Sequence, residues 1–140
     1  MQKFKKYLLI FITVAVIAAI GVWYYVFIYS KNNHRNVANE KGIEVTAMQL
    51  VSEYKASDSI ANKKYLDKAI QVTGEVAEAK TNEDSTIAVT LKSADAFSNV
   101  YCTLLKNQTA PVAGKVVILK GICTGMLSDV VLIDAVIVKQ

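Results

Sequence analysis

Two cysteines, Cys102 and Cys123, are the residues of this sequence that could form a disulfide. Each falls in an alternating stretch, on the side that we expect to face a core. Free cysteine is among the most buried residue types, but an oxidising compartment would permit a disulfide. Because the number of cysteines is even and both are expected to face the core, buried free thiols and a disulfide both remain open. Two thiols are too few for a metal site, and the Cys-x-x-Cys spacing of a redox pair is absent.

No other residues form a catalytic constellation. His34 is the only histidine, and it stands beside basic residues without the partners that catalysis or metal binding would need. Glu83 and Asp84 are adjacent carboxylates in a predicted turn, and such carboxylates are usually exposed to solvent without a catalytic role. The sequence has no glycine-rich phosphate loop and no nucleophile elbow. We therefore predict a protein that is not an enzyme and needs no cofactor.

Residues 7–29 form a run of 23 residues without a charge. As a helix this run would be roughly 34 Å long, and the hydrocarbon core of a bilayer is about 30 Å thick. It lacks the polar stripe of a soluble helix. Aromatic residues stand near both of its ends, as suits a membrane interface. We predict a transmembrane helix over 7–29, in contact with the lipid bilayer, after a cytoplasmic basic flank at 1–6.

The basic flanks of this run set the expected orientation. Three lysines precede it closely, whereas Lys31 and Arg35 follow at wider spacing. This bias favours a cytoplasmic N-terminus and a domain on the extracytoplasmic (periplasmic) side of the cell membrane. A cleaved signal peptide is the alternative, with a weak cleavage pattern ending at Ala18. The apolar run, however, is longer than the usual 7–15 residues of such a peptide.

The net charge of +4 comes from these flanks. Five basic residues and no acidic one precede residue 36, whereas residues 36–140 hold 11 lysines, no arginine and 12 acidic residues. That later part therefore carries a net charge of −1. Phosphate binding depends on clustered Lys and Arg. The division of charge argues against nucleic acid as the partner.

A polar, aperiodic stretch at 30–42 predicts a juxtamembrane linker before a domain at 43–140. The domain begins with a short extended piece at 43–45. Thr46 and Gln49 then fit a capping box, and Leu50 and Tyr54 share one face of the helix that follows. Ser57 is a candidate cap for a second helix over 58–65. We therefore expect one or two short helices before the strands.

After Leu66 the hydrophobic period changes to two, the period of a half-buried strand. The pattern predicts five strands, at 70–76, 87–91, 100–104, 116–124 and 130–138, with turns at 80–85, 93–98 and 125–128. Gly74 indicates a bend in the first strand, and a longer irregular connection joins the third to the fourth. These features favour a small mainly-β domain with a five-stranded barrel. An open meander and a small sandwich are the alternatives.

Several stretches of the domain carry a family resemblance. They are VANEK at 37–41, the helix around Leu50 and Tyr54, ANKKY at 61–65, KAIQVTGEV at 68–76, VYCT at 100–103, KGICTG at 120–125 and DVVL at 129–132. In these stretches the chain resembles the tRNA_anti-like family of bacterial OB-fold proteins, often membrane-anchored or lipoprotein domains. The resemblance implies an OB barrel but no ligand, because a shared fold is weak grounds for function. In that topology the fifth strand separates the strands of the two cysteines, so a disulfide would cross the barrel interior or its end.

OB barrels bind ligands on the outer face of their second and third strands and on neighbouring loops. Here the candidate binding residues on that face are Lys92, Asn99, Tyr101 and Thr103. One lysine and one tyrosine make a poor platform for stacked bases and phosphates. We therefore expect a non-catalytic module that binds an extracytoplasmic protein, peptide or glycan. Single-stranded nucleic acid is the alternative ligand.

Overall fold

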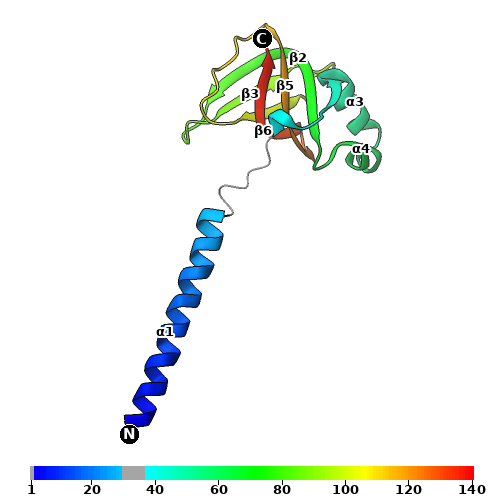
Figure 1. Cartoon of the computed structure of the whole chain (residues 1–140). Coiled ribbons are helices and arrows are strands. Elements are labelled where there is room, and N and C mark those ends of the chain that lie inside the picture. Colours follow the sequence, from blue (N-terminus) through cyan, green and yellow to red (C-terminus); the bar gives the residue numbers. More distant parts are fainter. Residues whose placement is uncertain (1, 30–36) are drawn as a thin grey trace. The chain divides into compact units, whose positions relative to one another are not determined.

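The structure is a computed structural model of the chain, and it describes residues 2–29 and 37–140 (Figure 1). Within the first of these ranges, side chains are described at residues 6–7 and 11–27. The chain divides into two compact units, Met1–Arg35 and Asn36–Gln140. His34 and most of the predicted linker lie outside the described residues.

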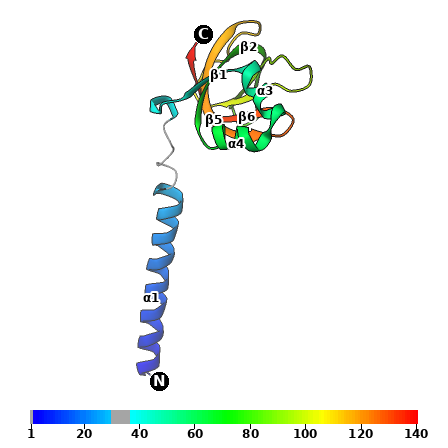
Figure 2. The same ribbon diagram turned by 90° about the vertical axis from the view of Figure 1, so that its right-hand side faces the viewer.

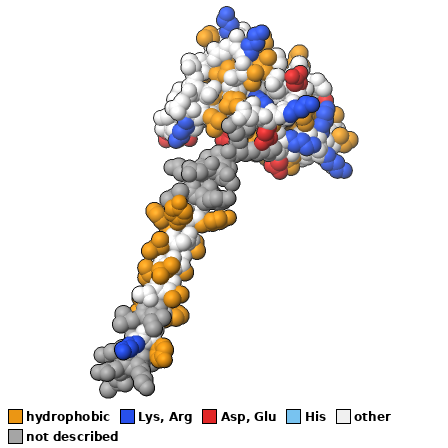
Figure 3. All heavy atoms as spheres, in the orientation of Figure 1, with side chains coloured by type: hydrophobic (Ala, Val, Ile, Leu, Met, Phe, Trp, Pro, Cys, Tyr) orange, Lys and Arg blue, Asp and Glu red, His pale blue; other side chains and the backbone are white. Residues whose placement is uncertain are grey.

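The first unit contains helix α1 (Gln2–Tyr24), which continues as the short π-helix η1 (Tyr25–Tyr29). The helical segment thus begins before residue 7 and ends where the uncharged run ends. Its described apolar side chains are exposed (Figure 3). Among the described residues, no helix reaches the combined length and hydropathy of a membrane span. The transmembrane helix therefore stays a prediction.

Five strands of the second unit close into the predicted barrel. They are β2 (Ala69–Thr81), β3 (Ile87–Leu91), β4 (Val100–Leu104), β5 (Val116–Met126) and β6 (Val130–Lys139). They follow the order β2-β3-β4-β6-β5, and a further pairing of β2 with β5 closes the ring. Strands β4 and β6 run parallel, whereas the other neighbouring pairs in the ring are antiparallel. Closure lets these strands satisfy one another without a long open edge.

The first barrel strand changes partner just after Gly74, where the sequence predicts a bend. Up to Glu75 the strand β2 pairs with β5, and from Val76 onward it pairs with β3. This second half extends the strand to Thr81, so the predicted turn begins two residues later than expected. A Cβ atom at Gly74 would lie 3.0 Å from the Ala47 Cβ and 3.2 Å from the Leu91 Cβ. A side chain at position 74 would therefore require these two neighbours to shift by a few tenths of an ångström.

A sixth strand, β1 (Ile43–Thr46), lies beside the barrel strand β2 and runs parallel to it. Just before it, the 3-10 helix η2 (Val37–Asn39) buries Val37. The Lys120 ammonium donates to the carbonyl oxygen of Ala38 at 3.1 Å and to that of Glu40. Residues 37–42, which were predicted as part of the linker, are thus packed against the barrel.

Two short helices, α3 (Ala47–Ala56) and α4 (Asp58–Tyr65), confirm the predicted helical pair. The Thr46 hydroxyl accepts from the Gln49 N–H at 3.2 Å, but the Gln49 side chain donates to Glu53 instead of reaching back. Only half of the expected capping box is therefore formed. The helices pack against the barrel (Figures 1 and 2), and Tyr54 and Tyr65 are buried in its core.

Candidate functional site

Strands β3, β4 and β6 lie side by side and carry the outward surface that we call the Tyr101 face. It consists of Ala88, Thr90, Tyr101, Thr103 and Val131. Thr90 and Val131 are the register partners of Tyr101 on either side, and Ala88 is opposite Thr103. All are partly exposed except Ala88, which is buried. The residues between them on β4, such as Cys102, point into the core. The Tyr101 face is therefore uncharged, with one aromatic side chain among methyl groups and hydroxyls.

Of the four predicted binding residues, the structure brings Tyr101 and Thr103 together. Lys92 follows the end of β3, and its ammonium lies 2.5 Å from the Glu75 carboxylate on β2. Asn99 precedes β4, and its side-chain oxygen accepts from the Ser93 N–H at 3.2 Å. Lys92 and Asn99 therefore already have partners within the fold. The side chains of Tyr101 and Thr103 are partly exposed to solvent on the outer face of β4.

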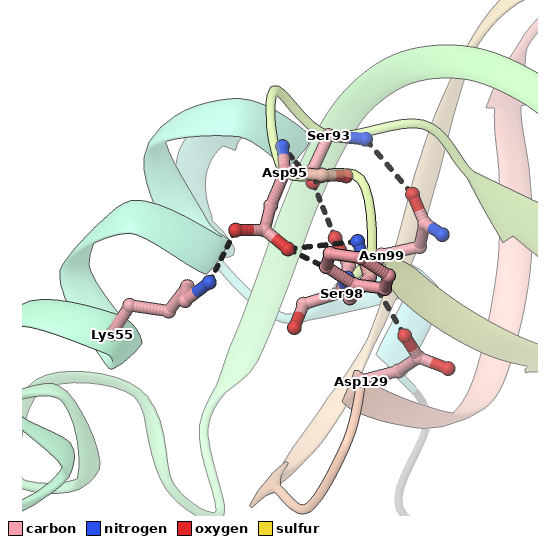
Figure 4. A network of polar contacts seen from close by, with 7 residues as sticks. Lys55, Ser93, Asp95, Ser98, Asn99 and Asp129 are labelled. Atoms are coloured by element: carbon pink, nitrogen blue, oxygen red, sulfur yellow. Dashed lines mark hydrogen bonds and ion pairs between the residues drawn. The ribbon is translucent and has the colours of Figure 1, made fainter.

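The loop from Ser93 to Ser98 borders this face and is held by side-chain bonds (Figure 4). One Asp95 oxygen accepts from the N–H groups of Phe97 at 2.9 Å and Ser98 at 3.0 Å, and the other is paired with Lys55 of α3. The hydrogen bond from Lys55 and those from the loop backbone lower the pKa of Asp95. The Ser93 hydroxyl accepts from the Asp95 N–H at 2.9 Å and donates to the Ser98 carbonyl. The loop is thus fixed to itself and to α3.

The β5–β6 turn is tied to the same loop. The Asn99 N–H donates to the Asp129 carboxylate at 2.7 Å, and the Val130 N–H donates to the Asn99 carbonyl at 3.0 Å. Two large apolar side chains stand on these connections, with Phe97 90% exposed and Leu127 92% exposed. From the sequence, both stretches are predicted only as turns. A large apolar residue inside a predicted turn was the signal that could have singled them out.

Two adjoining hollows flank Met48 of α3. One, of about 230 Å³, also contacts Lys55 and Asp95. The other, of about 390 Å³, reaches across Gly74 to Lys92. Because the Lys55–Asp95 and Lys92–Glu75 ion pairs already neutralise their charged rims, these hollows offer little attraction to a charged ligand.

Charge is unevenly distributed over the barrel. Residues 93–105 and 121–138, which contain β4, most of β6 and the loops beside them, have no Lys or Arg and three Asp. On the neighbouring part of β2, Lys80 is paired with Glu78 at 2.9 Å. Single-strand binding needs a positively charged groove along the backbone. The surface around Tyr101 lacks that property.

Cys102 and Cys123 are both buried and are free thiols in this structure. Both are register partners of Leu132 on β6, one from each side. Two strand spacings separate their Cα atoms by about 9–10 Å, whereas a disulfide needs less than about 7 Å. A bond between them would therefore require the strands to shift. Burial raises the pKa of Cys102 to about 12, and the Tyr54 hydroxyl lies 3.3 Å from the Cys123 sulfur.

The adjacent carboxylates at 83 and 84 belong to the β2–β3 turn. One Asp84 oxygen accepts from the Thr86 N–H at 3.1 Å and from its hydroxyl at 2.6 Å. These bonds lower the pKa of Asp84, and they give the carboxylate a turn-closing role. Within the described part of the chain, no group of three or more His, Cys, Asp or Glu side chains is arranged to hold a metal ion.

The closed barrel and its outward β3–β4 surface define this protein as an OB-fold binding module. The chain belongs to the tRNA_anti-like family, whose sequence pattern matches residues 1–137.

Among solved structures, the chain is similar to a "putative nucleic acid-binding lipoprotein" from Klebsiella pneumoniae subsp. pneumoniae. The TM-score is 0.54 at 15% identity, and the match covers 69% of this chain and 92% of that one. At this identity the likeness shows the fold alone. No curated protein matches the chain.

Proposed function

We propose that this chain is a non-catalytic binding module that receives a protein or peptide partner on the Tyr101 face. The observation that carries the proposal is the absence of Lys and Arg from residues 93–105 and 121–138, combined with a partly exposed tyrosine at the centre of the face. Tyrosine suits protein interfaces because its ring is apolar and its hydroxyl can hydrogen-bond. Thr90 and Thr103 add hydroxyl groups beside the ring.

A non-catalytic role is favoured by what the acidic side chains already do. Asp84, Asp95 and Asp129 each accept backbone N–H groups in turns. They are therefore engaged in local structure rather than directed at a common point. A general acid or base needs to reach a substrate proton, and these carboxylates are committed elsewhere.

Nucleic acid is the second candidate, because the similar Klebsiella protein carries nucleic acid-binding in its name. The charge pattern weighs against it here, because phosphate contacts supply most of the affinity of such proteins. Stacking positions on the strands themselves are few, since Tyr101 is the only aromatic residue of the described strands β3, β4 and β6, and the exposed Phe97 stands on the bordering loop. A glycan, whose rings commonly stack on aromatic side chains, is disfavoured on the strands for the same reason.

We further propose that the module is held at the extracytoplasmic side of the cell membrane by residues 7–29. The uncharged run and its basic flank support this location. Protease added to intact spheroplasts should degrade the domain while leaving a cytoplasmic control protein whole. Protection of the domain until the spheroplasts are lysed would contradict this location.

The partner site is tested by site-specific photo-crosslinking in living cells. A benzophenone amino acid replaces Tyr101 in one full-length variant and Glu44 of β1 in a matched control. Both positions are solvent-accessible and lie on different strands. We expect a discrete protein adduct from position 101 that is absent from position 44. Equal adducts at both positions, or none at 101, would contradict the proposed face.

A further inference from the structure

A hollow of about 320 Å³ lies between α4 and the β5–β6 hairpin, and we call it the Asn62 pocket. It is lined by Asn62, Leu66, Thr124, Gly125, Met126, Leu127 and Val131. All of these residues belong to the described part of the chain, and none of them is charged. The volume is at the lower end of the roughly 300–1,000 Å³ of ligand pockets. It suits one side chain of a partner better than a whole small molecule.

The Asn62 pocket adjoins the Tyr101 face through a shared residue. Val131 of β6 is the register partner of Tyr101 on one side and of Gly125 on the other. Two strand spacings, about 10 Å, therefore separate Tyr101 from Gly125. A peptide that lies on the Tyr101 face can thus place one of its side chains in the pocket.

Asn62 brings an unsatisfied polar atom to this pocket. Its side-chain oxygen is buried and has no hydrogen-bond partner within the described part of the chain. The Thr124 hydroxyl, by contrast, already donates to the Val131 carbonyl at 3.2 Å. Most buried polar side-chain atoms have a partner, and an acceptor left without one costs free energy. The unpaired oxygen therefore favours a donor that comes from a bound molecule.

Gly125 keeps the space beside this oxygen free of any side chain. A Cβ atom at position 125 would lie 3.6 Å from the Asn62 oxygen and 3.6 Å from the Leu66 Cδ1. The backbone of Gly125 has a φ of +103°, which glycine adopts more readily than other residues. Leu66 is 37% exposed, and exposed side chains change rotamer readily. A bound group that turns the Leu66 side chain aside therefore reaches the oxygen.

The lining selects a bound group that is apolar, uncharged and carries a donor. Leu66, Met126 and Leu127 supply apolar walls, and the Met126 thioether suits an aromatic ring. A cationic group would lose its hydration here without a carboxylate in the lining to compensate. An aliphatic group would leave the Asn62 oxygen unpaired. An aromatic ring that carries an N–H or O–H meets each of these conditions.

We infer that the Asn62 pocket receives a tryptophan or tyrosine side chain of the partner protein, whose N–H or O–H donates to the Asn62 side-chain oxygen. The inference rests on the proposed function in taking the partner to be a protein that lies on the Tyr101 face. It adds to that face a position that selects one kind of side chain.

The test compares two matched probes on the full-length chain in non-ionic detergent. N-acetyl-tryptophanamide has the indole N–H, whereas its N1-methylated form lacks this donor. Methyl resonances of Leu66, Leu127 and Val131 report binding in the pocket by NMR, and those of the exposed Val138 on β6 are the control.

We expect saturable shifts of the pocket resonances with the first probe at roughly millimolar concentration, and none at Val138. The methylated probe should bind at least about fivefold more weakly, because it leaves the Asn62 oxygen unpaired. Equal affinity of the two probes for the wild-type chain would overturn the inference, as would the absence of saturable shifts in the pocket.

Asn62→Leu is the matched variant, because leucine is close to asparagine in size and offers no acceptor. It should bind both probes with equal affinity. Its melting temperature should not fall below that of wild type, because the replaced oxygen has no partner to lose. A preference for the first probe that survives in this variant would assign the preference to another group and overturn the inference.

The same probes separate this inference from the proposed function. A protein adduct from position 101 without probe binding would leave the proposed function standing and remove only the aromatic side chain in the pocket. Binding of the first probe with the expected preference, but without an adduct from position 101, would support the pocket and remove the proposed face.

Discussion

At the residue scale, several polar side chains of this domain hold its loops in place. Asp95 and Asp129 each bind backbone N–H groups, and Asn99 links the two connections that carry them. Lys92 and Lys55 are paired with carboxylates. The side chains left facing outward around Tyr101 are neutral, and this is the chemical basis for expecting a protein partner.

The first prediction concerns the thiols. In the folded protein neither Cys102 nor Cys123 should react with a disulfide reagent such as DTNB at pH 8, because both are buried and burial raises the pKa of Cys102 to about 12. Unfolding in denaturant without reductant should release two reactive thiols. Finding none after such unfolding would mean that the cysteines are joined.

The second prediction concerns Asp95 and acid. The pKa of this carboxyl is lowered in the folded state, first by the hydrogen bond from Lys55. Its stabilisation of the loop is therefore present above the ordinary carboxyl pKa near 4 and is lost as the pH falls through the lowered value. Hydrogen exchange at Phe97 and Ser98 should show slow exchange at neutral pH and loss of protection in acid.

Asp95→Asn is the matched variant for this experiment. Its loop should exchange faster than wild type at neutral pH and should lose the acid step. A variant that keeps the same acid step would assign the transition to another group.

At the element scale, the strands were predictable where one face is buried. The alternation at 87–91 and 100–104 gives the observed bounds of β3 and β4, because a half-buried strand must repeat every two residues. The pairing of β1 with β2 was not predictable, since four residues carry too little pattern. The attachment of η2 depends on Lys120, whose partners lie about 80 residues earlier. The roles of Lys92 and Asn99 likewise depend on contacts that no local pattern encodes.

The third prediction tests the close packing at Gly74 of β2. Gly74→Ala should lower the free energy of unfolding by about 1–3 kcal/mol, as overpacking typically does, because the new methyl group would meet Ala47 and Leu91. Thr73→Ala on the same strand is the control and should cost clearly less. Chemical denaturation of both variants measures the difference. Equal effects would mean that the close approach at Gly74 is easily relaxed.

The fourth prediction tests the attachment of residues 37–42 to the barrel. Lys120→Met removes the ammonium that binds the Ala38 and Glu40 carbonyls, while keeping an unbranched chain. Hydrogen exchange in this segment should accelerate, and proteases should cut there earlier than in wild type. Lys115→Met, an exposed lysine just before the same strand, is the control and should behave like wild type.

At the scale of the whole molecule, charge separates the chain into two parts of different character. The basic residues before residue 36 flank an uncharged run, and the later part has a net charge of −1. The overall pI of about 9.0 therefore misrepresents the OB-fold domain. Composition divided by region predicted this domain's neutrality, and the alternation of the strands predicted few charges on the β3–β4 face. The pairing of Lys92 with Glu75 became known only from the structure.

The central claim is that this surface makes the OB barrel a protein-binding rather than a nucleic-acid-binding module. Its most direct test is a fluorescence anisotropy titration of the full-length chain in non-ionic detergent with labelled single-stranded DNA and RNA of 20 nucleotides. We predict no saturable binding up to about 100 μM protein, even in 20 mM salt. Saturable binding that is weakened by Tyr101→Ala and falls steeply as salt is added would contradict the claim. Binding through phosphate contacts loses affinity in this way when the salt concentration rises.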